Sequence, residues 1–119
     1  DFSLESGAAA AHVWYELPEE SRPTGVVCAG DAMAFGFISA LNKLGVQVPT
    51  DISVVGYDDL QVAQYYVPAL TTVHQPRRAL GVLAAHTLLA LIKKQDSGLP
   101  KPLEPWLVVR DSTAKPSDR

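Results

Sequence analysis

The sequence alternates between segments with helical periodicity and short apolar runs rich in β-branched residues, and this alternation strongly constrains the fold. The apolar runs occupy residues 25–29, 52–57, 70–73 and 106–110. Because helical segments separate successive runs, we expect the strands to lie parallel in one sheet with helices packed against it. The run at 25–29 is apolar throughout, which is typical of a strand covered on both faces. The sequence therefore predicts an α/β fold with a parallel sheet.

Two segments in the first half carry the apolar spacing of amphipathic helices. Ser3 can cap the first helix, which Pro18 ends. The second helix covers residues 33–44, with Asp31 as its expected N-cap and Gly45 just past its end. The spacing in this second segment is the clearest helical pattern in the chain.

The second half contains a third helix, a connector and a tail. The helix is expected to begin near Pro76 and includes the apolar run 80–92, which is too short to span a bilayer and predicts a buried helix. Residues 96–98 should end it. Three prolines make residues 99–105 an extended connector, and residues 114–119 are expected to be a polar tail. The chain has no initiating Met, and we expect it to be a piece of a longer protein.

Charge and cysteine content exclude several classes of protein. The chain has 10 Lys and Arg against 13 Asp and Glu, for a formal net charge of −3, with adjacent basic pairs only at 77–78 and 93–94. Duplex binding requires a dense basic surface, so we do not expect this stretch to hold DNA tightly by itself. The single cysteine, Cys28, cannot form an intrachain disulfide and is expected to be buried and inert in a reducing compartment.

Polar side chains follow three of the predicted strands. Asp31 follows the first, the pair Asp58 and Asp59 follows the second, and His74 and Gln75 follow the third. Ligands of open parallel sheets bind outside the carboxyl ends of the strands, where these side chains should converge. Sugar hydroxyls and heterocyclic N–H groups both suit a carboxylate acceptor. Each carboxylate could instead cap the following helix or turn, a reading favoured for Asp31.

Residues that could carry other chemistry have plainer interpretations. Phe2, from the sequence alone, is expected to pack in a core. His12 and His86 lie in predicted helices without a second ligand at metal spacing, so we predict no metal site. Residues 25–30 have the spacing of a P-loop, but Asp31 follows where Lys is needed. Acidic strand ends could hold Mg²⁺ for phosphoryl transfer, but we expect no basic side chain at a strand end to meet the phosphate. We predict neither an enzyme, nor catalytic residues, nor a cofactor.

Five motifs occur in order along nearly the whole chain: DFSLESG at 1–7, GDAMAFG at 30–36, VPTDISVVGYDD at 48–59, PALTTVHQP at 68–76 with Leu80-Gly81 following, and VVRDST at 108–113. These motifs resemble those of the lactose/galactose repressor (LacI/GalR) family. The order of the motifs makes the match specific where any one motif would be weak. The sequence is thus identified as similar to the carboxyl-terminal part of a LacI/GalR regulator, of a purine or ribose repressor-like kind.

This resemblance implies a periplasmic-binding-protein-like fold, in which two α/β subdomains enclose an effector. Residues 1–70 and 103–111 would form the carboxyl-terminal subdomain. Residues 71–102 would cross over and supply a helix to the amino-terminal subdomain, and residues 112–119 would be a tail. The DNA-binding headpiece would lie outside this chain.

The resemblance also implies a set of effector contacts. Phe2 matches an aromatic residue that stacks on the effector, and Asp58 matches a carboxylate that hydrogen-bonds it. Gln75 matches a polar position facing the cleft. Gly30 stands where many sugar-responsive members have an Asn that contacts the ligand, which removes one side-chain contact.

The implied function is sensing of a sugar, nucleoside or purine by a cytoplasmic repressor that binds its operator through a separate headpiece. Leu60, Tyr65 and Tyr66 lie in a segment that resembles the family's dimer-contacting region, so a homodimer is expected, although both tyrosines could instead pack in the core. The alternative is a solute-binding protein of a sugar transporter, which shares the fold. No membrane association is predicted.

Overall fold

The computed structural model describes residues 1–95, 98 and 100–116, and these form two compact units. The first unit contains residues 1–74 and the described residues from Leu107 onward, and the second spans Gln75–Trp106. The first unit carries the sheet and the candidate site, and each unit is described by itself.

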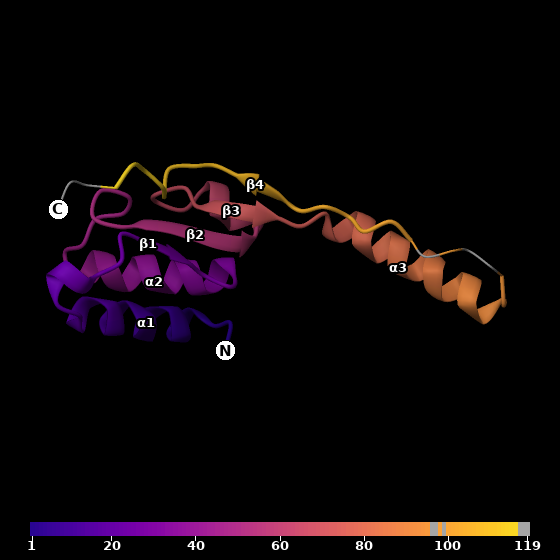
Figure 1. Ribbon diagram of the computed structural model, residues 1–119, viewed down its shortest axis with the longest axis horizontal. Coiled ribbons are helices and arrows are strands. Elements are labelled where there is room, and N and C mark those ends of the chain that lie inside the picture. Colours follow the sequence, from indigo (N-terminus) through magenta and orange to yellow (C-terminus); the bar gives the residue numbers. More distant parts are fainter. Residues whose placement is uncertain (96–97, 99, 117–119) are drawn as a thin grey trace. The chain divides into compact units, whose positions relative to one another are not determined.

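The sheet has four strands in the order β1-β2-β3-β4 (Figure 1). β1 pairs with β2 and β2 pairs with β3, both in parallel, with Val26 opposite Val54 and Val55 opposite Thr71. The predicted α/β fold is therefore confirmed, and the parallel arrangement is confirmed for β1, β2 and β3. The strands are Gly25–Val27 (β1), Ser53–Asp58 (β2), Thr71–His74 (β3) and Trp106–Val108 (β4).

Two helices accompany the sheet in the first unit. α1 is Leu4–Glu16, and the Ser3 side chain caps it as predicted by accepting a hydrogen bond from the backbone N–H of Ser6. α2 is Asp31–Lys43, and Gly45 beyond its end has a φ of 79°, a conformation that favours glycine. α2 packs against β2, and α1 packs against α2.

Glycines allow α1 and α2 to approach closely. A Cβ atom on Gly36 of α2 would lie 1.9 Å from the carbonyl oxygen of Leu4, and a Cβ on Gly7 of α1 would lie 2.0 Å from that of Met33. No larger residue fits at either contact. The core beneath α1 and α2 consists of buried apolar side chains, the largest of which are Ile38, Leu41, Ile52, Leu70 and Val54.

The other face of the sheet is open. Along β2, Val54 and Gly56 are buried whereas Val55 and Tyr57 are only half-buried. In β1 the side chain of Val27 is 76% exposed. The expectation that residues 25–29 form a strand covered on both faces is therefore wrong for this chain. Both helices of the unit pack on one face of the sheet, where they cover the core.

Short elements complete the first unit. The 3₁₀ helix η1, Glu19–Ser21, links α1 to β1, and the 3₁₀ helix η2, Gln61–Gln64, follows β2. The chain after β4 differs from the expected tail at its beginning. Ser112 is fully buried, and its hydroxyl accepts a hydrogen bond from the N–H of Thr71 and donates one to the carbonyl of Val54. Residues 117–119 of that expected tail lie outside the described residues.

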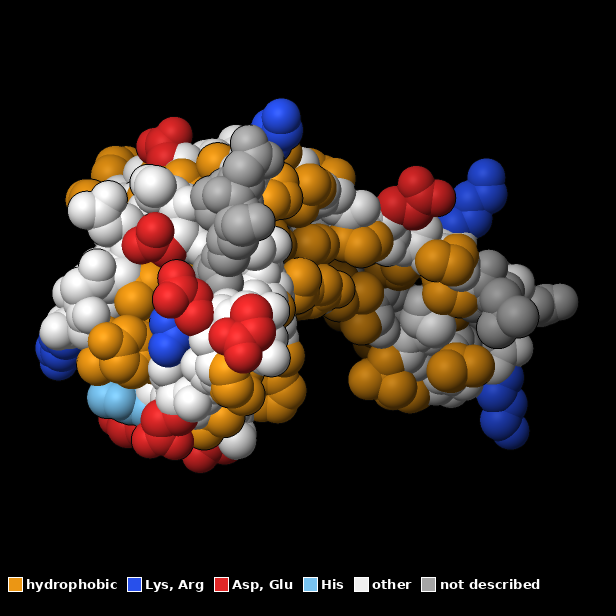
Figure 2. All heavy atoms as spheres, turned by 60° about the vertical axis from the view of Figure 1, so that its left-hand side comes forward, with side chains coloured by type: hydrophobic (Ala, Val, Ile, Leu, Met, Phe, Trp, Pro, Cys, Tyr) orange, Lys and Arg blue, Asp and Glu red, His pale blue; other side chains and the backbone are white. Residues whose placement is uncertain are grey.

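The second unit consists mainly of α3, Arg77–Ile92, which begins after Pro76 as predicted. Every residue of α3 is exposed or half-buried, so the prediction of a buried helix is wrong within this chain. The physical reason is that its unit offers α3 few packing partners, and its apolar side chains reach the surface (Figure 2). The predicted helix end at residues 96–98 falls partly outside the described residues; the helix ends at Ile92.

Candidate functional site

The carboxyl ends of β1, β2 and β3 lie at one edge of the sheet because the three strands are parallel. Asp58 ends β2 and His74 ends β3, and the two residues are partners in the strand register. Cys28 follows β1 directly and leads to the start of α2. The polar residues that follow the strands are thus brought to the edge at which open parallel sheets bind ligands.

Phe2 and Asp58 come together beside Gly30. The point where a Cβ on Gly30 would sit is 3.8 Å from the Phe2 Cδ1 atom and 3.7 Å from the Asp58 Oδ2 atom. The Phe2 side chain is 71% exposed, so the interpretation of this residue as core is wrong. An aromatic ring and a carboxylate therefore border one space, which the absence of a side chain at Gly30 leaves open.

The backbone at Asp58 has an unusual conformation. Asp58 has a φ of 114° and Asp59 a φ of 52°, in the region that residues with a side chain rarely adopt. Such residues cost on the order of 1–3 kcal/mol each and persist where the surrounding structure fixes them. Strain of this kind is concentrated at binding sites, which supports the assignment of Asp58 to the site.

Asp31 forms a hydrogen bond with Leu60, the residue that follows this turn. It is the first residue of α2, and Gly30 takes the N-cap position, so the prediction of Asp31 as the N-cap is wrong. The Asp31 side chain is fully buried and accepts hydrogen bonds from the hydroxyl of Thr72 at 2.6 Å and the N–H of Leu60 at 2.7 Å. Burial raises the pKa of its carboxyl; the two hydrogen bonds oppose this rise, and the nearby charges of Asp58 and Asp59 add to it.

Asp59 forms an ion-pair cluster with His74 and Arg110. Its Oδ2 atom is 2.7 Å from His74 Nδ1, and its Oδ1 atom is 2.7 Å from Arg110 Nη2. An ionised carboxylate only accepts hydrogen bonds, so the proton of that first bond belongs to Nδ1. Burial acts to raise the pKa of Asp59, but the hydrogen bonds and charges of His74 and Arg110 outweigh it and hold the pKa below its usual value.

Sequence reasoning missed this cluster. Arg110 lies two residues beyond β4, where we expected no basic side chain at a strand end, and its Nη2 atom bonds Asp59, the residue directly after β2. The adjacency of Asp58 and Asp59 was a signal that their roles differ. Nothing local to the sequence, however, indicates which carboxylate pairs with Arg110.

The remaining predicted site residues have different surroundings. Gln75 is half-buried and is the first residue of the second unit, directly after His74. Tyr65 is 73% exposed, and Leu60 is also exposed. Tyr66 packs against the core: its ring centroid is 4.6 Å from that of Phe35, and its hydroxyl donates to the Phe35 carbonyl. The alternative of core packing is thus correct for Tyr66 and wrong for Tyr65.

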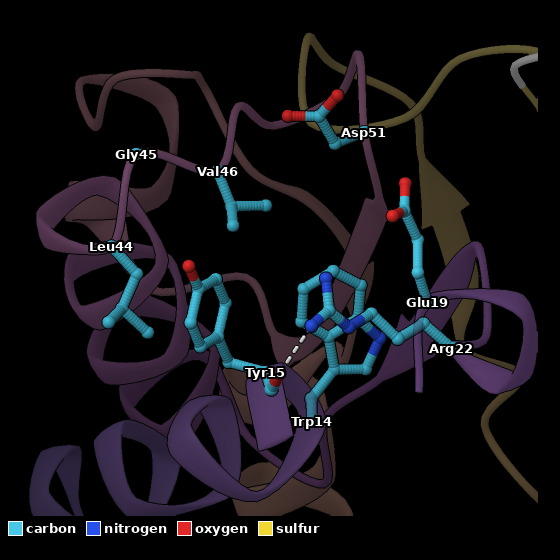
Figure 3. Close-up of a pocket in the computed structure, with 8 residues that line it drawn as sticks. All are labelled: Trp14, Tyr15, Glu19, Arg22, Leu44, Gly45, Val46 and Asp51. Carbon is cyan, nitrogen blue, oxygen red and sulfur yellow. Dashed lines mark hydrogen bonds between the residues drawn. The ribbon is translucent and has the colours of Figure 1, made fainter. Parts of the chain in front are cut away.

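A cavity of about 400 Å³ lies in the same unit, near the amino ends of β1 and β2 (Figure 3). Its central cation is Arg22, whose guanidinium lies over the rings of Trp14 and Tyr15 and donates to the carbonyls of Leu17 and Tyr15. Arg22 therefore satisfies carbonyl groups at the carboxyl end of α1. These contacts give the cavity residues a structural role distinct from the Phe2–Asp58 site.

A shallower groove of about 450 Å³ runs between α1, α2 and η2. It is bordered mainly by apolar and small side chains, including Leu4, Ala8, Phe35, Val62 and Tyr66.

In the described part of the chain, no helix is both long and apolar enough to cross a membrane.

Comparison with known proteins shows which family this chain resembles. The family model for a periplasmic binding protein-like domain matches residues 2–113. The chain is 46% identical over 115 residues to the HTH-type transcriptional repressor PurR of Serratia proteamaculans and, equally, to that of Proteus mirabilis. The match covers 96% of this chain and 33% of each repressor, so the chain spans about a third of the length of these relatives.

Solved structures of transcription regulators have the same fold. The transcription regulator CcpA of Lactococcus lactis matches 96% of this chain and 41% of its own with a TM-score of 0.85 and 32% identity. The lac repressor dimer bound to operator and an anti-inducer matches 97% of this chain and 40% of its own, with a TM-score of 0.85 and 36% identity. A regulator from Enterococcus faecium with bound ribose matches 96% of this chain and 41% of its own, with a TM-score of 0.83 and 33% identity.

Proposed function

Because the chain belongs to the LacI/GalR family of transcription regulators and consists of part of their periplasmic binding protein-like domain, we propose that it senses a small polar molecule and thereby controls a repressor. The observation that carries the proposal is the meeting of the Phe2 ring and the Asp58 carboxylate beside Gly30. The family alone leaves the position of the site open, and this geometry supports a site at Phe2 and Asp58.

The two side chains suit an effector with a flat face and several donors. An exposed aromatic ring offers an apolar surface on which a sugar ring or a heterocycle can stack. A carboxylate accepts two hydroxyl or two N–H groups at once. We therefore propose a sugar, nucleoside or purine base as the effector, held by Phe2 and Asp58 with Gln75 as a further polar contact.

The solved relatives support this class of ligand. Regulators of this family have been solved with bound ribose, sucrose and glucose at 33–35% identity to this chain. At Gly30 this chain has no side chain to offer a ligand, which leaves more room for a larger ring system than an Asn would.

The regulatory step follows from differential binding. An effector that binds one arrangement of two subdomains more tightly than another shifts the population toward it. A coupling of about 1–3 kcal/mol would change operator affinity roughly 5–150-fold. The operator would be bound by a helix-turn-helix headpiece outside this chain, in the cytoplasm. No bond is made or broken, so we propose a sensor and not an enzyme.

The division of the chain supports this proposal with shifted boundaries. β3, Thr71–His74, pairs with β2 in the first unit. Residues 1–74 with the described residues from Leu107 onward would therefore belong to the carboxyl-terminal subdomain, and residues 75–106, with α3, to the amino-terminal one. The exposed apolar side chains of α3 support this assignment, since they would be covered by the rest of that subdomain.

A homodimer is the proposed assembly. Leu60, Tyr65 and Val62 are exposed around η2, and Tyr66 borders the groove between α1, α2 and η2. A second copy packed on this surface would cover apolar area that water otherwise contacts. The relative solved as a lac repressor dimer supports the same assembly.

A thermal-shift panel on the intact protein tests the function. The panel contains D-ribose, D-glucose, adenosine, hypoxanthine and guanine, each at several concentrations. We expect one class to raise the melting temperature in a concentration-dependent way and to change operator affinity in the same preparation. A protein stabilised by no member of the panel, or stabilised without any change in operator affinity, would contradict the proposal. A solute-binding protein of a transporter, the alternative reading, would give the second result.

A further inference from the structure

The ion-pair cluster of Asp59, His74 and Arg110 has no part in the proposed effector contacts, although it adjoins them. We propose that Asp59 is a positioning residue, which fixes the turn that carries Asp58 and connects that turn to both segments through which the chain leaves and re-enters the first unit. This inference rests on the proposed function, because the position of Asp58 matters only if Asp58 meets an effector.

The first step of the argument is the strain in the turn. Two consecutive residues with side chains, Asp58 and Asp59, have φ values of 114° and 52°. Such a turn needs bonds from outside to hold it. The N–H of Asp59 donates to Thr72 at 3.4 Å and the N–H of Leu60 donates to Asp31 at 2.7 Å, which fixes the backbone on one side. The Asp59 carboxylate supplies two further bonds of 2.7 Å each, to His74 and Arg110.

The second step is the rigidity of the partner. Arg110 is itself held at three points: Nη1 donates to the Leu70 carbonyl at 2.9 Å, its backbone N–H donates to the Thr71 hydroxyl at 2.9 Å, and Nη2 bonds Asp59. The Asp59 side chain is 15% exposed and that of Arg110 is 19% exposed. Bonds between charged groups sheltered in this way are stronger than bonds at the open surface, and removing one partner leaves the other uncompensated.

The third step is the place of the partners in the chain. His74 is the last residue before the chain leaves the first unit, and Arg110 lies shortly after it returns at Leu107. One carboxylate therefore bonds the exit segment and the return segment, and the next residue toward the amino terminus is the proposed effector contact. A displacement of Asp58 on effector binding would reach both connecting segments through Asp59. This is a direct physical route for the coupling that the proposed function requires.

Calorimetric titration of the intact protein with D-ribose and with hypoxanthine tests the inference. Asp59→Asn keeps the shape of the side chain and removes its charge, and we expect it to weaken binding of whichever probe binds about tenfold or more. The matched control is Asp111→Asn, an exposed carboxylate beside Arg110, which should stay within about twofold of the wild type. Arg110→Gln should reproduce the loss and Arg110→Lys, which keeps the charge, should restore part of it. A loss confined to stability would not show this rescue. Asp59→Asn binding within twofold of the wild type would overturn the inference, and if Asp59→Asn does not fold, equal affinities of Arg110→Gln and Arg110→Lys would overturn it.

Backbone amide exchange without any probe separates this inference from the proposed function. We expect Asp59→Asn to speed exchange of the N–H groups of Leu60 and Arg110 about tenfold or more while amides of α2 keep their rates. Asp58→Asn should weaken binding at least about tenfold and leave these rates unchanged. If neither probe binds the wild type, the proposed effectors are wrong, and unchanged exchange at Leu60 in Asp59→Asn would then also overturn the positioning role.

Discussion

The carboxylate of Asp31 at the start of α2 accepts a 2.6 Å hydrogen bond from the hydroxyl of Thr72 in β3, and both side chains are fully buried. The bond joins residues 41 positions apart in the chain. The other carboxylate oxygen of Asp31 accepts a hydrogen bond from the N–H of Leu60, which directly follows the turn at Asp58 and Asp59. Asp31 thus fastens α2, β3 and the turn at Asp58 to each other, and its burial makes each of its bonds costly to lose.

Thr72→Val is expected to destabilise the protein by about 1–3 kcal/mol, because it removes the hydroxyl that donates to a buried carboxylate and accepts from the N–H of Asp59, while nearly preserving the size of the side chain. The measurement is chemical denaturation of the intact protein. Thr72→Ser, which keeps the hydroxyl, is the control and should cost less than half as much. A loss in Thr72→Ser that equals or exceeds the loss in Thr72→Val would contradict the dominant role given to the hydrogen bond.

Asp59 should make stability depend on pH. Its pKa in the folded protein is held below the usual 3.8, so its ionised form stabilises the fold above that value, and this stabilisation is lost as the pH falls through the lowered pKa. We expect the difference in unfolding free energy between wild type and Asp59→Asn to shrink steadily below about pH 4. Denaturation series at matched pH values provide the measurement. A difference that grows as the pH falls below about 4 would contradict the ion pairs described for Asp59.

Gly36→Ala should disrupt the contact between α1 and α2. The new Cβ would lie 1.9 Å from the carbonyl oxygen of Leu4, so the helices must separate, at an expected cost of about 1–3 kcal/mol or more. Gly81→Ala in α3 is the matched control, because nothing lies within 4 Å of its Cβ position. There the better helix propensity of Ala predicts a gain of about 0.5–1 kcal/mol. Thermal unfolding of both variants measures the contrast, and similar effects in the two would refute the close helix packing.

The thiol of Cys28 is expected to be unreactive in the folded protein. The side chain is 6% exposed, and burial, with a further contribution from the Asp31 charge, raises its pKa to about 11. At pH 8 almost none of it is thiolate, the form that reacts. Labelling with a maleimide should be slow in buffer and complete in denaturant, as followed by mass spectrometry. Fast labelling in buffer would mean that the segment after β1 opens readily.

The parts of the fold that local pattern encodes were predictable. The apolar spacing of α1 and α2, the Ser3 cap and the β-branched runs depend on residues near each other in the chain, and these elements were confirmed. Burial was harder to predict, because it depends on what covers an element. The apolar runs in β1 and α3 were expected to be buried, and Val27 and Leu91 are instead exposed.

The roles of the acidic residues could be predicted only in part. The pattern of carboxylates after strands located the site edge, but Asp31 differs from an N-cap by one position and its partner is distant in the sequence. Asp59 and Arg110 are 51 positions apart, so no local signal joins them. Phe2 was expected to contact the effector only through the family resemblance, since an aromatic residue near a terminus carries no such signal by itself.

The central claim is that Asp58 holds a small effector beside Phe2, and calorimetric titration of the intact protein tests it most directly. The effector is the compound from the ribose, glucose, adenosine, hypoxanthine and guanine panel that stabilises the wild type. The control is Asp51→Asn, because Asp51 precedes β2 whereas Asp58 ends it. We predict that Asp58→Asn and Phe2→Ala each weaken binding at least about tenfold while Asp51→Asn binds like the wild type. Wild-type affinity in both Asp58→Asn and Phe2→Ala would contradict the account.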